Sequence, residues 1–169
     1  MGQWEFILQL LLAVLFGGLI GSERQAHGRP AGLRTHILVC LGSAAIIIAF
    51  QKLHLLLTSD AGDMIRMDPA RAAAGIITGI GFLGAGTILK GKDFVLGLTT
   101  AASIWVVAAI GITLGLAEYY LGITVTALVL LTLFVLDKIS ISSDLYAEVD
   151  ISAEKETDVF GEAYSCLRK

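Results

Sequence analysis

Residues 79–86 read GIGFLGAG, and the interpretation of these four glycines decides the fold class of the chain. Gly79, Gly81 and Gly84 have the G-x-G-x-x-G spacing of a dinucleotide-binding loop. Such a loop needs a strand before it, a helix after it and an acidic residue about 20 positions further on. Here DPARAAAGIIT precedes the glycines and SIWVV follows at that distance, so the dinucleotide-binding interpretation fails.

A second phosphate-binding pattern begins at the end of the same stretch. Gly86, Gly91 and Lys92 match a P-loop, but Asp93 stands where Ser or Thr would hold magnesium. A carboxylate there would repel phosphate, and the sequence holds no complete catalytic constellation. We therefore expect a protein that is not an enzyme, needs no cofactor and binds no nucleic acid.

The composition places the glycine-rich stretch in a membrane. The chain has 169 residues, of which 56% are hydrophobic and 16% are charged, unlike an ordinary soluble domain. A transmembrane helix takes about 20 mainly apolar residues. Five segments are candidates: Trp4–Gly21, His36–Leu57, Ala72–Leu89, Phe94–Leu116 and Tyr119–Leu136. The sequence predicts an all-α integral membrane protein with about five transmembrane helices, in which the short third and fifth segments could also be half-spans.

Basic residues predict the orientation, since they concentrate in cytoplasmic loops. Six of them follow the first, third and fifth segments, and three lie on the opposite side: Arg24, Arg29, Arg34, Lys90, Lys92 and Lys138 against Lys52, Arg66 and Arg71. We therefore predict a multi-pass protein with its N-terminus outside and its C-terminus inside.

A domain boundary is predicted near Asp137, where the composition changes. Residues 137–169 carry twelve charged side chains, eight of them acidic. We expect residues 1–136 to form the transmembrane domain and residues 137–169 to form a short cytoplasmic tail. The tail offers about one strand and one short helix, which is too little for an independent core.

Cysteine and histidine give no metal site. Cys40 and Cys166 would lie in a membrane helix and in the tail, so free thiols are expected. The three histidines, His27, His36 and His54, are scattered over both sides of the membrane, which is poor evidence for a metal cluster.

Small residues at a spacing of four predict close contact between helices. Within a membrane, G-x-x-x-G lets two helix backbones approach each other. Three pairs have this spacing, and GIGFLGAG adds further small positions: Gly17 and Gly21, Gly75 and Gly79, Gly111 and Gly115, with Gly81, Gly84 and Gly86. Packing is the preferred interpretation, a part in a permeation path is the alternative, and a homo-oligomer, most simply a two-fold dimer, is expected.

Polar residues at the helix ends are the candidate functional residues. Glu23 and Arg24 end the first segment and Arg34 opens the second, which predicts one cytoplasmic ion-paired cluster. Asp68 is expected to cap the third helix and to hold Arg71, a cation that the helix dipole disfavours in a first turn.

A second polar group lies in the fourth segment. Thr99 and Ser103 share a helix face with Thr100 beside them, which indicates either bonds to the helix's own carbonyls or contacts between helices. Trp105 would lie near the middle of the membrane, where its indole N–H needs a buried acceptor. We expect this face to line the same intramembrane region as Arg71.

Together these residues resemble a known family. The matching blocks run in order from about residue 17 to residue 115: GSERQ at 21–25, AGLRT at 31–35, DPAR at 68–71, GIGFLGAG at 79–86 and GLTTAASIW at 97–105. The chain resembles the MgtC/SapB family of bacterial inner-membrane proteins. Long members continue into a cytoplasmic ACT-like domain, so the resemblance implies that residues 137–169 begin such a domain or are its truncated remnant.

The resemblance also implies a function. It implies a cytoplasmic-membrane protein linked to growth or survival when magnesium is scarce, and to virulence in pathogens. It implies a non-enzymatic regulator that binds partner membrane proteins, such as the F-type ATP synthase. A magnesium transporter or channel is the alternative, favoured by Glu23, Asp68 and the glycine-interrupted helices.

Overall fold

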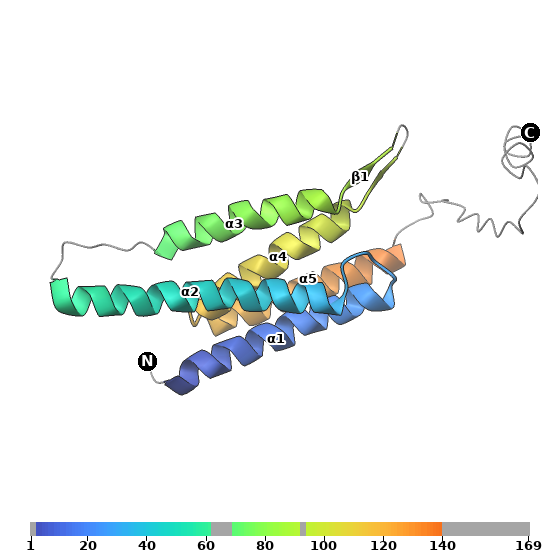
Figure 1. The fold of residues 1–169 in the computed structure, drawn as a ribbon. Helices are drawn as coiled ribbons and strands as arrows, with labels where there is room; N and C mark the ends of the chain where they lie inside the picture. Colours follow the sequence, from blue (N-terminus) through green and yellow to red (C-terminus); the bar gives the residue numbers. More distant parts are fainter. Residues whose placement is uncertain (1–2, 62–68, 92–93, 140–169) are drawn as a thin grey trace, which may run out of the picture. The chain divides into compact units, whose positions relative to one another are not determined.

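The computed structural model describes residues 3–61, 69–91 and 94–139, which form five helices and one short hairpin (Figure 1). The elements follow in the order α1 (Gln3–Ala26), α2 (Leu33–Ala61), α3 (Pro69–Gly86), β1 (Leu89–Lys90), β2 (Val95–Leu96), α4 (Leu98–Gly115) and α5 (Tyr119–Ile139). The prediction of five helical segments is confirmed.

Successive helices alternate in direction, so that α2 and α4 run parallel. Gly21 of α1 lies against Leu33 at the start of α2, and Gly17 lies against His36 one turn later. Such pairing near the end of one helix and the start of the next makes α1 and α2 antiparallel. Gly84, near the end of α3, contacts Ala101 near the start of α4, so these two helices are also antiparallel.

Two glycine pairs bring α1 and α4 into backbone contact with α2. A β-carbon at Gly17 would lie 2.8 Å from the carbonyl oxygen of His36, and one at Gly115 would lie 2.9 Å from that of Ala44. A β-carbon at Gly111 would overlap the carbonyl oxygen of Cys40. Any side chain at these positions would separate the helices, so glycine is what permits this packing.

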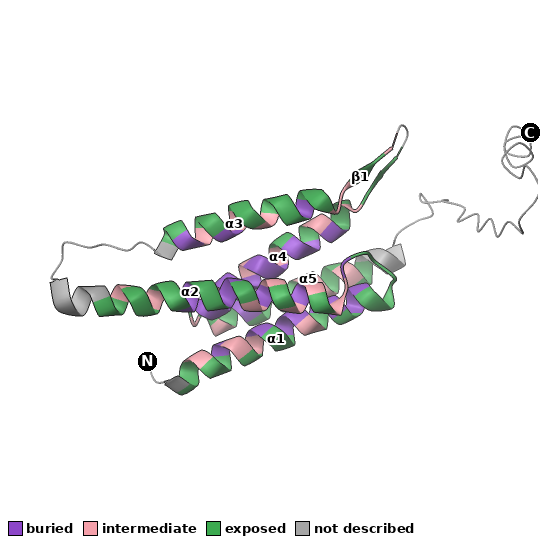
Figure 2. Ribbon diagram, viewed as in Figure 1, coloured by how far each residue is buried: buried purple, intermediate pink, exposed green. Residues whose placement is uncertain are grey.

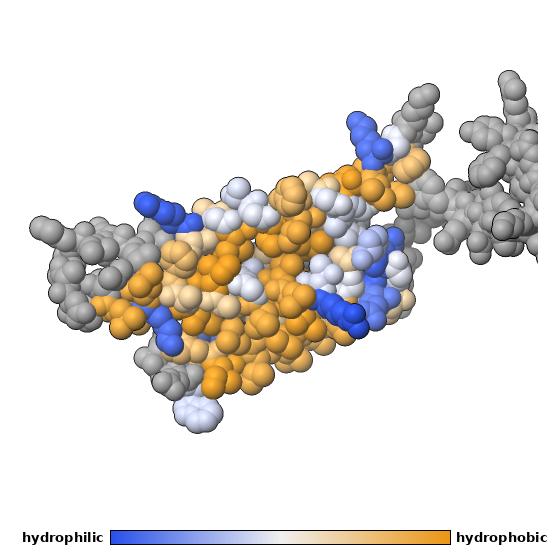
Figure 3. All heavy atoms as spheres, viewed as in Figure 1, coloured by the Kyte–Doolittle hydropathy of each residue, from blue (hydrophilic) through white to orange (hydrophobic). Residues whose placement is uncertain are grey.

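The core lies where α1, α2 and α4 meet. Ala13, Ile20, Cys40, Val107 and Leu114 from these three helices are fully buried. Figure 2 shows the buried residues gathered on α4 and on the facing sides of α1 and α2, whereas much of α3 is exposed. The apolar surface of the bundle is broad, with hydrophilic side chains at its two ends (Figure 3). Such a surface is suited to lipid.

Three helices are long and apolar enough to cross a membrane: Trp4–Ala26, Leu33–Leu56 and Leu98–Gly115. The described apolar parts of α3 and α5, Ala70–Gly86 and Tyr119–Val135, are shorter. An all-helical membrane protein is thus supported, whereas five complete crossings and an outside N-terminus stay predictions.

The predicted helix boundaries were wrong around residues 87–97. The third segment was expected to reach Leu89 and the fourth to begin at Phe94, but Leu89 pairs with Leu96 and Lys90 with Val95 in a hairpin. The hydroxyl of Thr87 donates to the carbonyl of Gly84 at 2.8 Å, which closes the end of α3. Gly97 has a φ of +85° and begins α4, a conformation that other residues rarely adopt.

The first helix is longer than predicted. It continues past Gly21 to Ala26 and ends where Gly28 adopts a φ of +64°. The amide of Arg29 donates to the carbonyl of Arg24 at 3.0 Å, as in a Schellman end. Glu23 and Arg24 therefore lie within the last turns of α1 rather than in a loop.

The predicted tail is mostly outside the described residues. The chain divides into two compact units, Met1–Asp137 and Lys138–Lys169. Only Lys138 and Ile139 of the second unit are described, as the last residues of α5. The expected ACT-like start, Cys166, and the proposed helix cap Asp68 all lie outside the described residues.

Replacing Gly111 with Ala should destabilise the bundle, because the added methyl meets the Cys40 carbonyl. Overpacking of this kind costs about 1–3 kcal/mol. Gly81→Ala is the matched control, since a β-carbon there meets nothing within 4 Å and Ala is the better helix former. Thermal unfolding in detergent measures both. Equal midpoints for the two variants would contradict the close α2–α4 packing.

Candidate functional site

A buried ion pair lies at the end of α1. The Arg24 Nε donates to Glu23 Oε2 at 2.8 Å, and Nη2 donates to Oε1 at 3.4 Å. Both side chains are almost fully inaccessible, at 1% and 2% exposure. A charge at this depth is tolerated only when it is paired, so each residue depends on the other.

The surroundings of the pair hold it in place. His27, one turn after Glu23, has its Nδ1 3.1 Å from Glu23 Oε1. The side-chain oxygen of Gln25 accepts a hydrogen bond from the Leu33 amide at 3.2 Å, which ties the end of α1 to the start of α2. The close contact at Gly21 draws the same two helix ends together.

His36 connects this region to α4. Its Nδ1 lies 2.9 Å from the carbonyl oxygen of Gly32, and its Nε2 lies 3.1 Å from the hydroxyl of Ser103. The Ser103 hydroxyl in turn lies 2.8 Å from the carbonyl oxygen of Thr100. His36 is fully buried, and its Cβ lies beside Gly21, two and three positions before Glu23 and Arg24.

We call Glu23, Arg24, His36, Thr100 and Ser103 the polar cluster. All five are buried, and they come from α1, α2 and α4. Of the residues predicted from the sequence, Glu23, Arg24, Thr100 and Ser103 are brought together here. Both predicted roles of Ser103, a bond to its own helix and a contact between helices, are found. Its hydroxyl lies within hydrogen-bond distance of the Thr100 carbonyl on α4 and of His36 on α2.

The hydrogen bonds of His36 restrict the position of its proton. A carbonyl only accepts, so Nδ1 carries the hydrogen in the bond to Gly32. In the neutral ring Nε2 is then an acceptor, and Ser103 must donate to it instead of to Thr100. In the protonated ring Nε2 donates to Ser103, whose hydroxyl is free to donate to Thr100. Protonation would therefore switch the Ser103 hydroxyl between two acceptors.

Three predicted residues point away from the polar cluster. Arg34 lies in the first turn of α2 but is exposed, and it makes no ion pair with the residues that the structure describes. The predicted three-membered cluster is therefore a pair with His27 as its neighbour. Thr99 is exposed, and Trp105 is 45% exposed. Trp105 thus faces outward on α4, and the buried acceptor predicted for its indole N–H stays a prediction.

Arg71 and the Thr99–Trp105 face do not share a region. Arg71 is the third residue of α3, whereas the start of α4 lies beside the end of α3, at Gly84. Thirteen residues of helix separate Arg71 from Gly84, which is about 20 Å. The prediction failed because it ignored that α3 and α4 are antiparallel. Arg71 is exposed, and its expected partner Asp68 is not described.

The predicted packing glycines fall into two groups. Gly17, Gly21, Gly111 and Gly115 meet other helices at close range, and Gly84 is in ordinary contact with Ala101. A β-carbon at any of the others would meet no described atom within 4 Å: Gly75, Gly79, Gly81 and Gly86.

Sequence reasoning missed His36 and Gln9. Both are fully buried, and the Nε2 of Gln9 lies 3.5 Å from the carbonyl oxygen of Gly115. The signal for His36 was present, since it directly follows the AGLRT block, four positions after Gly32. It was discounted because the three histidines are scattered in the sequence.

The polar cluster is suited to linking helices rather than to binding a metal ion. No group of three His, Cys, Asp or Glu side chains that could hold a metal exists among the described residues. Both oxygens of Glu23 face the Arg24 guanidinium, which would compete with a cation. What the cluster offers is a neutral, hydrogen-bonded link between three helices.

The fold and this site define a class: a helical membrane protein whose helices pack through paired glycines beside a buried ion pair. The particular family follows from comparison with known sequences. The chain belongs to the MgtC family, whose sequence profile matches residues 10–141. The resemblance seen in the sequence is thereby confirmed.

Several named relatives are similar to this chain. The "Putative magnesium transporter YhiD" of Escherichia coli K12 is 46% identical over 136 residues, covering 80% of this chain and 62% of the relative. Protein MgtC of Salmonella typhimurium LT2 is 38% identical over 154 residues, covering 91% and 61%. Protein SrpB of Synechococcus elongatus is 40% identical over 141 residues, covering 78% and 75%. The chain thus spans about three fifths of the length of YhiD and MgtC. No solved structure matches it significantly.

Breaking the ion pair should destabilise the protein strongly. Glu23→Gln and Arg24→Gln each leave one buried charge alone, which costs about 3–5 kcal/mol. Arg34→Gln is the matched control and should change stability little, because Arg34 is exposed. Thermal unfolding in detergent of the single and double variants gives the coupling energy of the pair. Additive losses would contradict a direct Glu23–Arg24 interaction.

Removing the Ser103 hydroxyl should weaken the link between α2 and α4. Ser103→Ala leaves the His36 Nε2 buried without its partner, at a cost of about 1–3 kcal/mol. Thr99→Ala, one turn earlier on α4 and exposed, should have a smaller effect. Thermal unfolding and hydrogen exchange at the start of α4 check this. A loss as large for Thr99→Ala would show that the hydrogen bond is not responsible.

Proposed function

We propose that this protein is a non-enzymatic regulator in the bacterial cytoplasmic membrane that supports growth when magnesium is scarce. The magnesium link rests on the MgtC family and on the name of the relative YhiD. Because the chain spans about three fifths of YhiD and MgtC, the activity of the whole relatives is carried over here only as a proposal.

The observation that carries the regulatory reading is the state of the buried carboxylate. Magnesium retains several waters and prefers carboxylate oxygens that are free to bind it. Glu23 instead directs both oxygens to Arg24, with His27 beside them. Because Glu23 and Arg24 neutralise each other, the pair stabilises one arrangement of the helices. A single stable arrangement suits a protein that acts by binding other proteins through its surface.

The surface for such partners is also available. Exposed apolar side chains cover the bundle, among them Phe82 on the open face of α3. We propose membrane proteins as partners, with the F-type ATP synthase and a second copy of this chain as the first ones to test.

Cation transport is the second candidate. It is favoured by the name of YhiD and by glycine-interrupted helices such as α3, which resemble the broken helices of transporters. A path through the polar cluster would require Glu23 to leave Arg24. The two functions therefore differ in whether magnesium crosses the bilayer in the protein alone.

Flux into liposomes separates the two candidates. Liposomes containing the purified chain and a magnesium-sensitive dye should take up magnesium no faster than empty liposomes, with a magnesium ionophore as the positive control. The same chain should restore growth of a deletion strain at low magnesium. Saturable uptake that Glu23→Gln abolishes and Arg34→Gln leaves intact would overturn the regulatory proposal.

Partner binding is tested in cells at equal membrane abundance. Crosslinking through a photoreactive residue at position 82 should capture a membrane protein in the parent chain, and the same probe at Leu131 of α5 is the positional control. Parent-like growth without any specific crosslinked partner from either position would contradict regulation by partner binding.

A further inference from the structure

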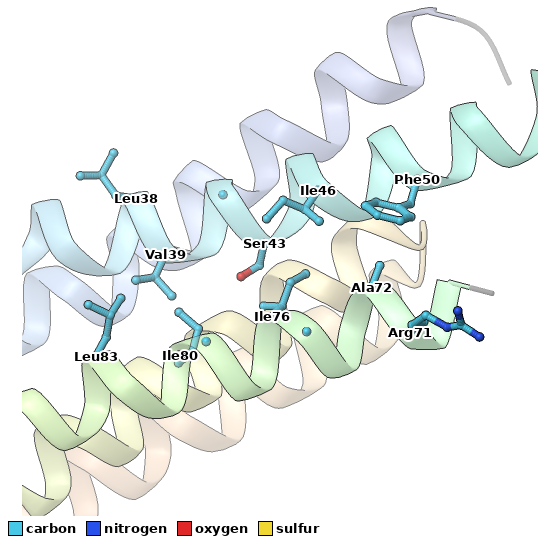
Figure 4. A pocket seen from close by; sticks show the side chains of 13 residues that line it. Leu38, Val39, Ser43, Ile46, Phe50, Arg71, Ala72, Ile76, Ile80 and Leu83 are labelled. Atoms are coloured by element: carbon cyan, nitrogen blue, oxygen red, sulfur yellow. The ribbon is translucent and has the colours of Figure 1, made fainter. Parts of the chain in front are cut away.

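A groove of roughly 660 Å³ runs between α2 and α3 on the surface of the bundle (Figure 4). Its walls are almost entirely apolar: Leu38, Val39, Ile46, Phe50, Ile76 and Leu83 supply most of the side chains. Arg71 is the only charged side chain among the described lining residues, and Figure 4 places it at the end of the groove near Phe50.

Glycines keep this groove open. Gly42 of α2 and Gly75 and Gly79 of α3 line it, and a β-carbon at any of them would meet no described atom within 4 Å. At the other two G-x-x-x-G pairs, by contrast, atoms of α2 occupy the space where a β-carbon would lie. Within a bilayer an apolar groove does not stay empty, so an apolar occupant from outside the described chain must fill it.

The dimensions identify the kind of occupant. Twelve residues of helix separate Arg71 from Leu83, about 18 Å at 1.5 Å per residue. One leaflet of the hydrocarbon core is about 15 Å deep, so the groove has the length of one leaflet. A volume of roughly 660 Å³ over this length leaves room for a flexible hydrocarbon chain.

The charge identifies the head group. Arg71 stands in the first turn of α3, so it lies at the depth where an apolar helix meets the head-group region. Its exposed guanidinium can donate two parallel hydrogen bonds to a phosphate. A lipid whose acyl chain lies in the groove would bring its phosphate to this end.

We propose that the α2–α3 groove is a binding site for one anionic phospholipid, with an acyl chain along Gly75 and Gly79 and the phosphate at Arg71. This site is separate from the polar cluster, which lies at the start of α2 and α4. The proposal therefore stands or falls independently of the regulatory function.

Native mass spectrometry of the detergent-purified chain tests the proposal, with phosphatidylglycerol and phosphatidylcholine added in equal amounts. The parent should retain phosphatidylglycerol about fivefold more than phosphatidylcholine, the equivalent of ~1 kcal/mol for one arginine at an anionic lipid surface. Arg71→Gln should lose this preference. Arg34→Gln should keep it, because Arg34 is exposed at the start of α2, whereas Arg71 lies near Phe50 toward the other end of that helix.

A second pair of variants tests the groove itself. Gly79→Leu should fill the groove and reduce retention of both lipids at least fivefold, whereas Gly81→Leu, also open but outside the groove, should not. Circular dichroism verifies that each variant is helical, and Gly79→Ala provides a smaller change should Gly79→Leu fail to fold.

Three outcomes would overturn the proposal. The first is equal retention of the two lipids by the parent. The second is displacement of bound lipid by millimolar inorganic phosphate or glycerol phosphate, since the acyl chain would then contribute nothing. The third is a lipid-free dimer that Gly79→Leu converts to monomer, which would assign the groove to a second copy of the chain.

Discussion

The structure depends on the close approach of α1 and α4 to α2. Within lipid there is no hydrophobic force to press helices together, because the solvent is as apolar as the side chains. Attraction must come from many short-range contacts, which fall off steeply with distance. Gly17, Gly21, Gly111 and Gly115 supply these contacts, since each places α2 atoms where a side chain would otherwise stand.

The polar cluster follows from this approach. Glu23, Arg24 and His36 are buried because the α1–α2 contact at Gly21 closes over them, and Ser103 reaches His36 because α2 and α4 run parallel in contact. Burial in turn makes the pairing obligatory, since an unpaired charge at this depth would be costly. The glycines and the ion pair therefore support each other. The first bring the helices together, and the second permits only arrangements in which both charges are satisfied.

The same motif has two different roles in this chain. Two G-x-x-x-G pairs, on α1 and α4, pack against α2 inside the bundle. The third pair, Gly75 and Gly79 on α3, lines the groove at the surface. A small-residue spacing shows that something can come close, but it does not say what. On α1 and α4 the neighbour is α2. On α3 the neighbour lies outside the described chain, which leaves this helix as the surface for lipid or protein.

The sequence by itself determined the class and the local structure. Apolar segments of spanning length predicted five helices, and failed nucleotide motifs together with the composition excluded the phosphate-loop reading of GIGFLGAG, because these properties depend on neighbouring residues alone. Adjacent Glu23 and Arg24 were also predicted as partners, since one helix end holds both. Only the tertiary structure decided which glycines pack against another helix and that His36 bonds Ser103, 67 residues away. It also decided that Arg71 lies far from the Thr99–Trp105 face. Each of these depends on the order and direction of the packed helices, and helical periodicity carries no information about either.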